Sequence, residues 1–275
     1  MDILSYFDFD DATYAAYDIV LYKFKDGRKN EFLQEGVQSY RRAFVSDEDL
    51  EAVVKVMGGT KAERIQEFIP TAPIIKSGDF GEILTYLIFS ALHPEYHIKP
   101  LRWRWQEDVN RAVHFTDIMW LYCPDLANPQ ATDKMLTIEV KTRASNPGKE
   151  SSINSAIEGA LTDSITRDSL TLSYMKRQYI RDKRYDEAKV VERFEKPVQF
   201  PYYGSYNAVA VVETDYLDHN HIANLDFNQI TKVRNWNQVN AANNKKMSLF
   251  VVPVKALKQL YEEMYQNVLN SCTED

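Results

Sequence analysis

The chain has 275 residues, of which 44% are apolar and 27% are charged, proportions that are ordinary for a folded protein with a sizeable core. No run approaches the roughly 18 to 20 apolar residues of a membrane span, and the acidic N-terminus lacks the basic start of a signal peptide. The two cysteines form neither a disulfide framework nor a metal cluster. We therefore predict a cytoplasmic protein.

The net charge of −7 is unevenly distributed along the chain. Five acids and no Lys or Arg lie within Met1–Tyr22, whereas nine Lys or Arg accompany five acids within Lys141–Arg184, and six accompany one acid within Ala223–Lys258. A protein that binds DNA unaided is usually basic, because neutralised phosphates supply most of its affinity. The two basic segments could contact a phosphate backbone or could be solvated helix faces, and composition leaves both interpretations open.

The N-terminal quarter of the chain predicts a strand followed by helices. Apolar residues over Ala15–Phe24 indicate a strand, and the spacing over Asn30–Phe44 indicates an amphipathic helix. Ser46 precedes a run of acids, which is typical of a helix start. We interpret residues 1–73 as an α-rich N-terminal extension or subdomain that could dock a partner, and residues 74–275 as the main domain.

The rest of the chain alternates between helix-like and strand-like patterns. Five successive elements are predicted first: a helix over Asp79–Leu92, strands over His97–Trp105, Ala112–Cys123 and Met135–Arg143, and a helix over Ser152–Arg184. Strands over Asn207–Thr214 and Ser248–Val254 precede a last helix, Lys255–Val268, and the asparagine-rich run Asn224–Asn244 is predicted to be loop and turn. This order predicts an α/β protein with a mixed sheet flanked by helices.

One predicted strand alternates tryptophan with arginine. Trp103 and Trp105 are separated by Arg104 and preceded by Arg102. Aromatic side chains beside cations can stack on bases. We favour the simpler interpretation, in which the tryptophans form a core face and the arginines are solvated.

The strand Met135–Arg143 carries an acid and a lysine on one face. Side chains two positions apart in a strand point the same way, so Glu139 and Lys141 share a face while Val140 points into the opposite layer. An acid and a lysine on a central strand are costly to bury unless they serve each other or a ligand. A half-exposed strand with an ion pair on its polar face would give the same pattern.

Two further acids complete a candidate site. Asp117 lies 22 residues before Glu139 in an otherwise apolar run, a separation that fits adjacent antiparallel strands with converging carboxylates. A divalent cation such as Mg²⁺ would relieve the repulsion between these acids. Glu82 lies early in the helix predicted over Asp79–Leu92. Taken singly, Asp117 could be a strand-end acid bonded to backbone amides, and Glu82 could serve the helix dipole.

Together, Glu82 on a helix, Asp117 on a strand and Glu139-Val140-Lys141 on the next strand resemble the PD-(D/E)XK nuclease superfamily over about Gly78 to Thr214. The resemblance implies the restriction-endonuclease-like fold with an αβββαβ core. It also implies Mg²⁺, with Mn²⁺ as a substitute, bound by Asp117, Glu139 and the Val140 carbonyl with help from Glu82. Lys141 would then position or activate the attacking water. Thr116 stands where the superfamily's name places a proline, at a position that varies within it.

A closer resemblance is to the DUF1837 family, which contains the HamA nuclease subunits of bacterial Hachiman anti-phage defence. It rests on Gly81-Glu82, Thr116-Asp117 and the run Glu139-Val140-Lys141-Thr142. The resemblance implies a DNA nuclease that acts as the effector of a complex with a HamB helicase. A protein of another class, a catalytically silent module that binds nucleic acid or regulates a helicase, is the alternative; such degenerate members lose the acids or the lysine, and all four residues are present here.

The basic segment that follows the candidate strand is the predicted contact for DNA. In the restriction-endonuclease-like fold a helix at this place flanks the cleft, and positions 177, 181 and 184 would share one helical stripe. The predicted contact residues are Arg143, Lys176, Arg177, Arg181 and Arg184.

Overall fold

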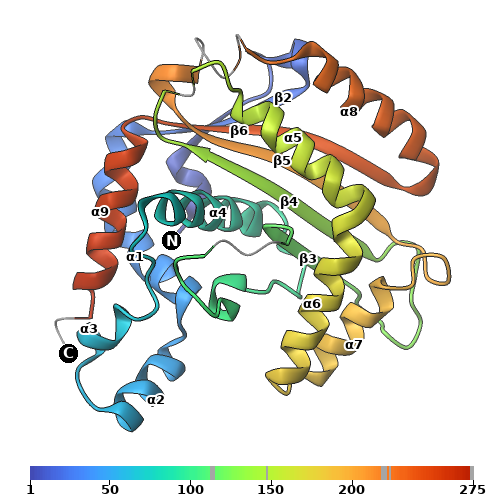
Figure 1. Cartoon of the computed structure of the whole chain (residues 1–275). Coiled ribbons are helices and arrows are strands. Elements are labelled where there is room, and N and C mark those ends of the chain that lie inside the picture. The colour runs from blue at the N-terminus through green and yellow to red at the C-terminus, as the bar shows by residue number, and fades with distance from the viewer. Residues whose placement is uncertain (112–114, 147, 218–221, 223, 273–275) are drawn as a thin grey trace.

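The computed structural model describes residues 1–111, 115–146, 148–217, 222 and 224–272. One mixed sheet in the order β1-β2-β6-β5-β4-β3 runs through the molecule (Figure 1). Its strands are β1 Phe7–Asp10, β2 Ile19–Phe24, β3 Ile118–Tyr122, β4 Lys134–Arg143, β5 Tyr203–Glu213 and β6 Lys245–Val254. The central strands are parallel, and β1 and β3 pair antiparallel at the two edges. This architecture confirms the predicted α/β class and its restriction-endonuclease-like mixed sheet.

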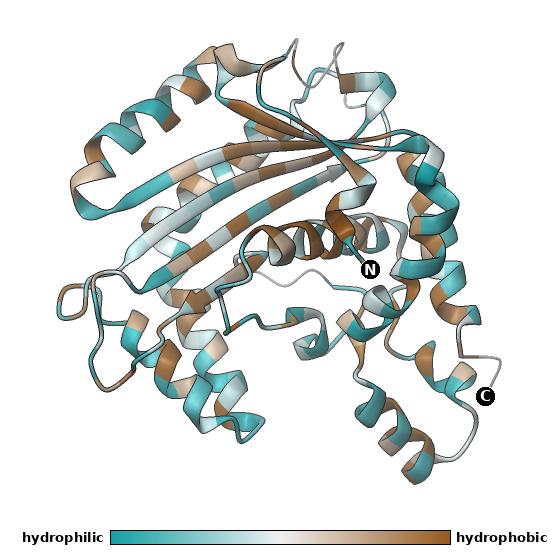
Figure 2. Cartoon of the chain, turned by 180° about the vertical axis from the view of Figure 1, so that it is seen from behind, coloured by the Kyte–Doolittle hydropathy of each residue, from teal (hydrophilic) through white to brown (hydrophobic). Residues whose placement is uncertain are grey.

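Helices cover both faces of the sheet, and each face has its own hydrophobic core. The helices are α1 Lys29–Phe44, α2 Asp47–Met57, α3 Lys61–Ile65, α4 Pro73–Leu92, α5 Ser152–Thr162, α6 Asp168–Arg181, α7 Tyr185–Phe194, α8 Phe227–Asn240 and α9 Leu257–Asn270. The first core lies beneath α4, α1 and α9, and the second beneath α5, α6, α7 and α8. Along β5, Val209 packs into the first core and Ala208 into the second, as strand alternation requires. Figure 2 shows the apolar residues concentrated in the middle of the strands.

The N-terminal segment shares the sheet with the rest of the chain. Strand β2 pairs parallel with β6, and β1 pairs antiparallel with β2. Helix α1 packs on α9 at the other end of the sequence (Figure 1). The predicted boundary at residue 73 coincides with the start of α4, but both the sheet and the first core cross it.

Several predicted elements are confirmed and two are wrong. Ser46 caps α2 by accepting a hydrogen bond from the Asp49 N–H, and β4 covers the predicted strand. The asparagine-rich run predicted as loop instead contains helix α8, capped by Asp226 and held by Ile230 and Val233 in the second core. Burial of its apolar side therefore outweighs the weak helix propensity of asparagine.

The strand predicted over His97–Trp105 is the second error. Only one isolated bridge forms there, between Ile98 and Leu121, and Arg102–Trp105 is a short 3₁₀ helix. A strand would place Trp103 and Trp105 on the same face, whereas Trp103 is buried in the first core and Trp105 in the second. Burial of both rings in separate cores thus decides the local structure. Within the described residues, no helix is long and apolar enough to cross a membrane.

Candidate active site

Strand β4 presents its acid and lysine to the layer of α5. Glu139 pairs in register with Ala208 and Lys141 with Ala210, and both alanines belong to the second core. Val140 packs into the first core on the other face. The predicted division of this strand into a polar and an apolar face is therefore confirmed.

Asp117 lies immediately before β3, at the edge of the sheet. Because Ile118 pairs with Ile138 in the antiparallel register, Asp117 comes beside Glu139. Its Oδ2 accepts a hydrogen bond from the Val140 N–H at 2.8 Å. Asp117 is thus both a strand-end acid bonded to a backbone amide and a neighbour of Glu139. Strand β3, Ile118–Tyr122, lies within the predicted run Ala112–Cys123 but starts later than predicted. Residues 112–114 of that run lie outside the described part of the chain.

Glu82 lies inside helix α4 rather than near its start. The helix begins at Pro73, which is tolerated at the first helical position because its missing N–H would have no partner there. Glu82 therefore lies beyond the first turn, where the helix dipole has little influence, and the dipole interpretation is wrong. Its buried Oε2 accepts hydrogen bonds from Arg102 Nη2 at 2.6 Å and from Trp103 Nε1 at 3.2 Å.

Arg102 bridges two of the acids. Its Nη2 also donates to Asp117 Oδ1 at 3.0 Å, so a single nitrogen contacts both Glu82 and Asp117. Only 11% of the Arg102 side chain is exposed. The prediction of a solvated arginine is therefore wrong at this position, whereas the predicted burial of Trp103 and Trp105 is confirmed.

Glu139 has its own cations on the α5 side. Its Oε1 accepts from Lys141 Nζ at 2.6 Å, and its Oε2 accepts from Arg167 Nη2 at 3.0 Å. Arg167 also pairs with the buried Asp163 at 2.7 Å. Both residues lie in a single π-helical turn, Asp163–Arg167, between α5 and α6. Such wide turns occur often at functional sites, and this one brings Arg167 to Glu139.

Two glycines make room for this cluster. A Cβ atom on Gly159 of α5 would overlap the Glu139 carboxyl group, and one on Gly81 of α4 would overlap the Thr142 hydroxyl. Helix α5 can therefore approach β4 closely enough to bury Glu139 only because it has no side chain at position 159. Likewise, α4 can approach β4 closely because position 81, next to Glu82, has no side chain.

Burial dominates the electrostatics of the acids. It raises the pKa of Glu82 to about 7 against the opposing effect of Arg102, and with the help of Glu139 it raises that of Asp163 to about 8. Burial also raises the pKa of Glu139 and, well above its ordinary value, that of Asp79. For Lys141 burial would lower the pKa, but the neighbouring Glu139 and Asp117 outweigh it, and the pKa is raised. Lys141 is therefore cationic at neutral pH.

The structure brings Glu82, Asp117, Glu139 and Lys141 together and adds residues that the sequence did not indicate. Arg102 lies 20 residues from Glu82 and 15 from Asp117, so no local pattern connects them. Asp163 and Arg167 form an i,i+4 pair, a spacing that a closer inspection of the polar helix could have singled out. No pattern in the sequence marked Gly159 as a residue of the site.

The donor set suits magnesium, but in the structure the same carboxylates are paired with cations of the chain. Carboxylate oxygens are the ligands that Mg²⁺ prefers. Yet no group of three or more His, Cys, Asp or Glu side chains within the described ranges is placed to hold an ion. The chain's own cations neutralise the acids instead: Arg102 on Glu82 and Asp117, and Lys141 and Arg167 on Glu139.

The predicted DNA-contact residues are only partly brought together. Arg181 and Arg184 line a cavity of about 480 Å³ with Lys99 and Arg104. Helix α6 ends at Arg181 and Lys183 has a positive φ of 60°, so the predicted helical stripe through position 184 is wrong. The turn nevertheless returns Arg184 to the same cavity.

The remaining predicted contacts lie outside that cavity. Lys176 is paired with Glu195, and Arg143 lies 3.6 Å from Glu150 at the end of β4. Arg177 is exposed on α6.

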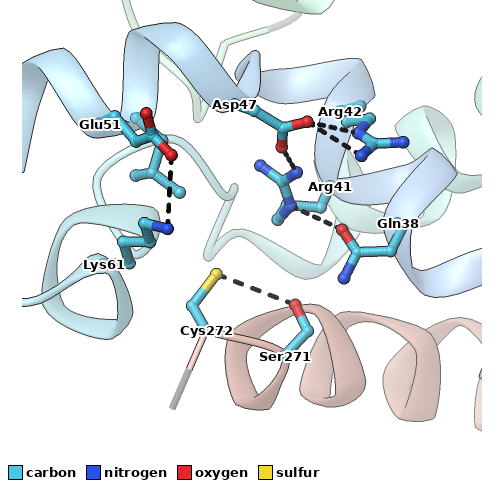
Figure 3. A pocket seen from close by; sticks show the side chains of 9 residues that line it. Gln38, Arg41, Arg42, Asp47, Glu51, Lys61, Ser271 and Cys272 are labelled. Carbon is cyan, nitrogen blue, oxygen red and sulfur yellow. Dashed lines mark hydrogen bonds and ion pairs between the residues drawn. The ribbon is translucent and has the colours of Figure 1, made fainter. Parts of the chain in front are cut away.

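A further cavity of about 310 Å³ lies between α1, α2 and the end of α9 (Figure 3). Arg41 and Arg42 both pair with Asp47 there, and Lys61 pairs with Glu51. Arg41 is buried, and its Nη1 has no hydrogen-bond partner. None of the predicted site residues lines this cavity, so it is a weaker candidate for an active site than the cluster at β4.

Comparison with known proteins agrees with the resemblance noted in the sequence. No curated protein matches the chain. The family model HamA matches residues 5–268, which is nearly the whole chain. The chain therefore belongs to the HamA family, and with it to the proteins related to Hachiman defence.

Proposed function

We propose that the chain is a metal-dependent DNA nuclease that hydrolyses phosphodiester bonds as the effector of a Hachiman defence complex. The observation that carries this proposal is the pairing of Glu139 with Lys141 on one face of β4, beside Asp117 at the start of β3. Lys141 is 41% exposed although its partner is buried. An ammonium group held by a buried acid and open to solvent is suited to meet a phosphate.

The chain's own residues divide the chemistry between them. Lys141, cationic and fixed by Glu139 at 2.6 Å, would stabilise the negative charge that develops on the phosphate in the transition state. Arg167 orients Glu139 through its other oxygen. Magnesium on Asp117, Glu139 and the Val140 carbonyl, with Glu82 assisting, would supply a Lewis acid for the phosphoryl oxygen, and Mn²⁺ would substitute.

The cavity lined by Lys99, Arg104, Arg181 and Arg184 is our candidate for the path of the DNA backbone. Its cations outnumber its acids, Asp49 and Asp182. Trp105 lines both this cavity and the small cavity beside Asp117. Arg143 at the end of β4 and the exposed Arg177 on α6 would add further phosphate contacts.

A helicase of the HamB kind is the partner that we propose. The net charge of −7 opposes unaided association with DNA, and an unrestrained cytoplasmic nuclease would attack its own chromosome. Residues 1–73 remain our candidate docking region. Their acidic start, Met1–Tyr22, includes β1 at the edge of the sheet.

Digestion of linear, circular and single-stranded DNA by the purified chain tests the nuclease proposal. We expect cleavage with Mg²⁺ or Mn²⁺, binding without turnover in Ca²⁺, and no cleavage in EDTA, with the helicase present where the chain alone is weak. The Glu139→Gln protein is the control. Undiminished cleavage by that variant, or by the native chain in excess EDTA, would contradict the proposal.

Co-expression with a HamB-like helicase followed by size-exclusion chromatography tests the partner. We expect a single complex at micromolar concentration and stronger DNA digestion by the complex than by the chain alone. Separate elution together with strong digestion by the isolated chain would remove the support for a partner.

One observation favours the alternative, a catalytically silent DNA-binding or regulatory subunit. Arginines and a lysine already neutralise the acids of the candidate site. A silent subunit would bind DNA with the same affinity in Mg²⁺ and in EDTA and cleave it in neither, with or without the helicase.

A further inference from the structure

We propose that Arg102 occupies the cation position between Glu82 and Asp117, so that Arg102 and a divalent metal ion exclude each other. The structure then represents a closed form of the site, and a metal ion that uses Glu82 together with Asp117 binds only after the guanidinium group has left. This inference rests on the proposed metal dependence, and it names Arg102 as the residue that controls metal binding.

The geometry places one nitrogen where an ion would be held. Arg102 Nη2 lies 2.6 Å from Glu82 Oε2 and 3.0 Å from Asp117 Oδ1, oxygens that belong to α4 and to the start of β3. Mg²⁺ binds carboxylate oxygens at about 2.1 Å. An ion that joined these two oxygens would therefore need the space that the guanidinium group fills. In the described part of the chain, Arg102 is the cation whose ion pairs join these two acids.

The cavity on the Asp117 side of Arg102 leaves little room for a second cation. A cavity of about 20 Å³ lies beside Arg102 and Asp117, which is space for about one water molecule. A magnesium ion usually keeps several of its waters when it binds to protein. This cavity, which Glu82 does not line, is therefore too small to take a hydrated ion beside Asp117 while the arginine stays.

The arginine is held by charge more than by a complete set of hydrogen bonds. Its Nε and Nη1 are buried without any acceptor, and Asp79 Oδ2 nearby is buried without any donor. Unsatisfied buried donors are costly, and a single nitrogen contact is weaker than a bidentate arginine–carboxylate pair. Glu82 and Asp117 reach Arg102 from two different elements, and one divalent ion could bind both carboxylate oxygens at once.

Removal of Arg102 should therefore expose a metal site rather than only weaken the fold. The measurement is the Kd for Mn²⁺ by isothermal titration calorimetry, without DNA, on the full chain and on Arg102→Gln. We expect binding at least about tenfold tighter in the variant, because loss of a charge-assisted contact of this kind changes an equilibrium by about that factor. Arg102→Lys should lie between the two.

Arg41→Gln is the matched control. Arg41 is also a buried arginine that pairs with an acid and has an unpartnered Nη1, but it lies at the cavity of Figure 3. Its replacement should leave the Mn²⁺ affinity unchanged. Equal or weaker Mn²⁺ binding by Arg102→Gln than by the native chain would overturn the inference, as would an equal gain in Arg41→Gln.

A second measurement on the native chain covers the case in which Arg102→Gln does not fold. The ¹⁵Nε–H signal of Arg102, assigned by its loss in Arg102→Lys, should shift when Mg²⁺ saturates the protein. An unchanged signal at saturation would overturn the inference and leave the nuclease proposal standing. No binding of Mn²⁺ to any of these proteins would instead contradict both the metal dependence and the inference.

Discussion

The candidate site has two halves, and in both a carboxylate is paired with cations of the chain, but in different surroundings. In the outer half, on the α5 side of the sheet, Glu139 pairs with Lys141 and Arg167. In the inner half, on the α4 side, Glu82 pairs with Arg102. The Lys141 side chain is 41% exposed and that of Arg102 only 11%. The cation of the outer half is therefore accessible to a substrate, and the cation of the inner half is largely covered.

The difference follows from what packs on each half. Trp103 donates to Glu82 and is buried in the first core, so it covers the inner half. On the outer side Gly159 presents no side chain to Glu139, and the π-helical turn Asp163–Arg167 carries Arg167 to it from the end of α5. Asp117 joins the halves at the edge of the sheet.

The largest loss of DNA cleavage is expected from a substitution in the outer half of the site. Lys141→Ala should lower DNA cleavage by about a thousandfold while the fold persists, because the charge that stabilises the transition state is lost. Lys134→Ala is the control, since Lys134 lies at the other end of β4 with a similar exposure of 38%. Initial rates on plasmid DNA and circular dichroism measure the two properties. Comparable losses in both variants would show that β4, rather than its catalytic face, had been damaged.

A methyl group added at position 159 should lower DNA cleavage almost as much, because it displaces a site residue without removing a charge. Gly159→Ala forces Glu139 aside, and we expect cleavage to fall by about a hundredfold, as displaced catalytic groups do. Gly78→Ala in α4 meets no atom within 4 Å and should keep full activity and gain about 0.5–1 kcal/mol of stability. Rates and thermal unfolding of both proteins provide the test. Full activity in Gly159→Ala would show that the outer half of the site does not take part in DNA cleavage.

Charge reversal in the basic cavity should have a smaller effect. Arg181→Glu with Arg184→Glu should weaken DNA binding by about tenfold or more at moderate salt and reduce the slope of log Kd against log salt by about two. Lys232→Glu with Lys258→Glu changes the net charge equally on α8 and α9, away from the cavity. Fluorescence anisotropy across a salt series measures both. If the two double variants respond alike, Arg181 and Arg184 contribute only to a solvated surface.

The smallest effect is a pH dependence of stability. The pKa of Asp163 is about 8 in the folded protein, against an ordinary value of 3.8. As pH rises from about 4 to about 8 the unfolded chain releases this proton first, so the free energy of unfolding falls over that window, by on the order of a few kcal/mol. Asp163→Asn should remove this contribution. Urea midpoints at pH 5 and pH 8 for both proteins test it, and equal slopes with pH would show that Asp163 is not protonated in the fold.

The sequence by itself determined the elements whose signals are local. The alternation along β4 predicted which side of the strand carries Glu139 and Lys141, and the 22-residue separation predicted the antiparallel pairing that brings Asp117 beside Glu139. The cap at Ser46 predicted the start of α2. These features depend on neighbouring residues and on strand geometry, so they are visible without the fold.

Only the tertiary structure decided which charges balance the acids. Arg102 reaches Glu82 and Asp117 because two tryptophans are buried in different cores and turn the chain between them. Strand β2 pairs with β6, more than 200 residues away, and α8 forms because its apolar residues meet the second core. These contacts join residues from distant parts of the chain, and they form only when the packing of the two cores brings those parts together.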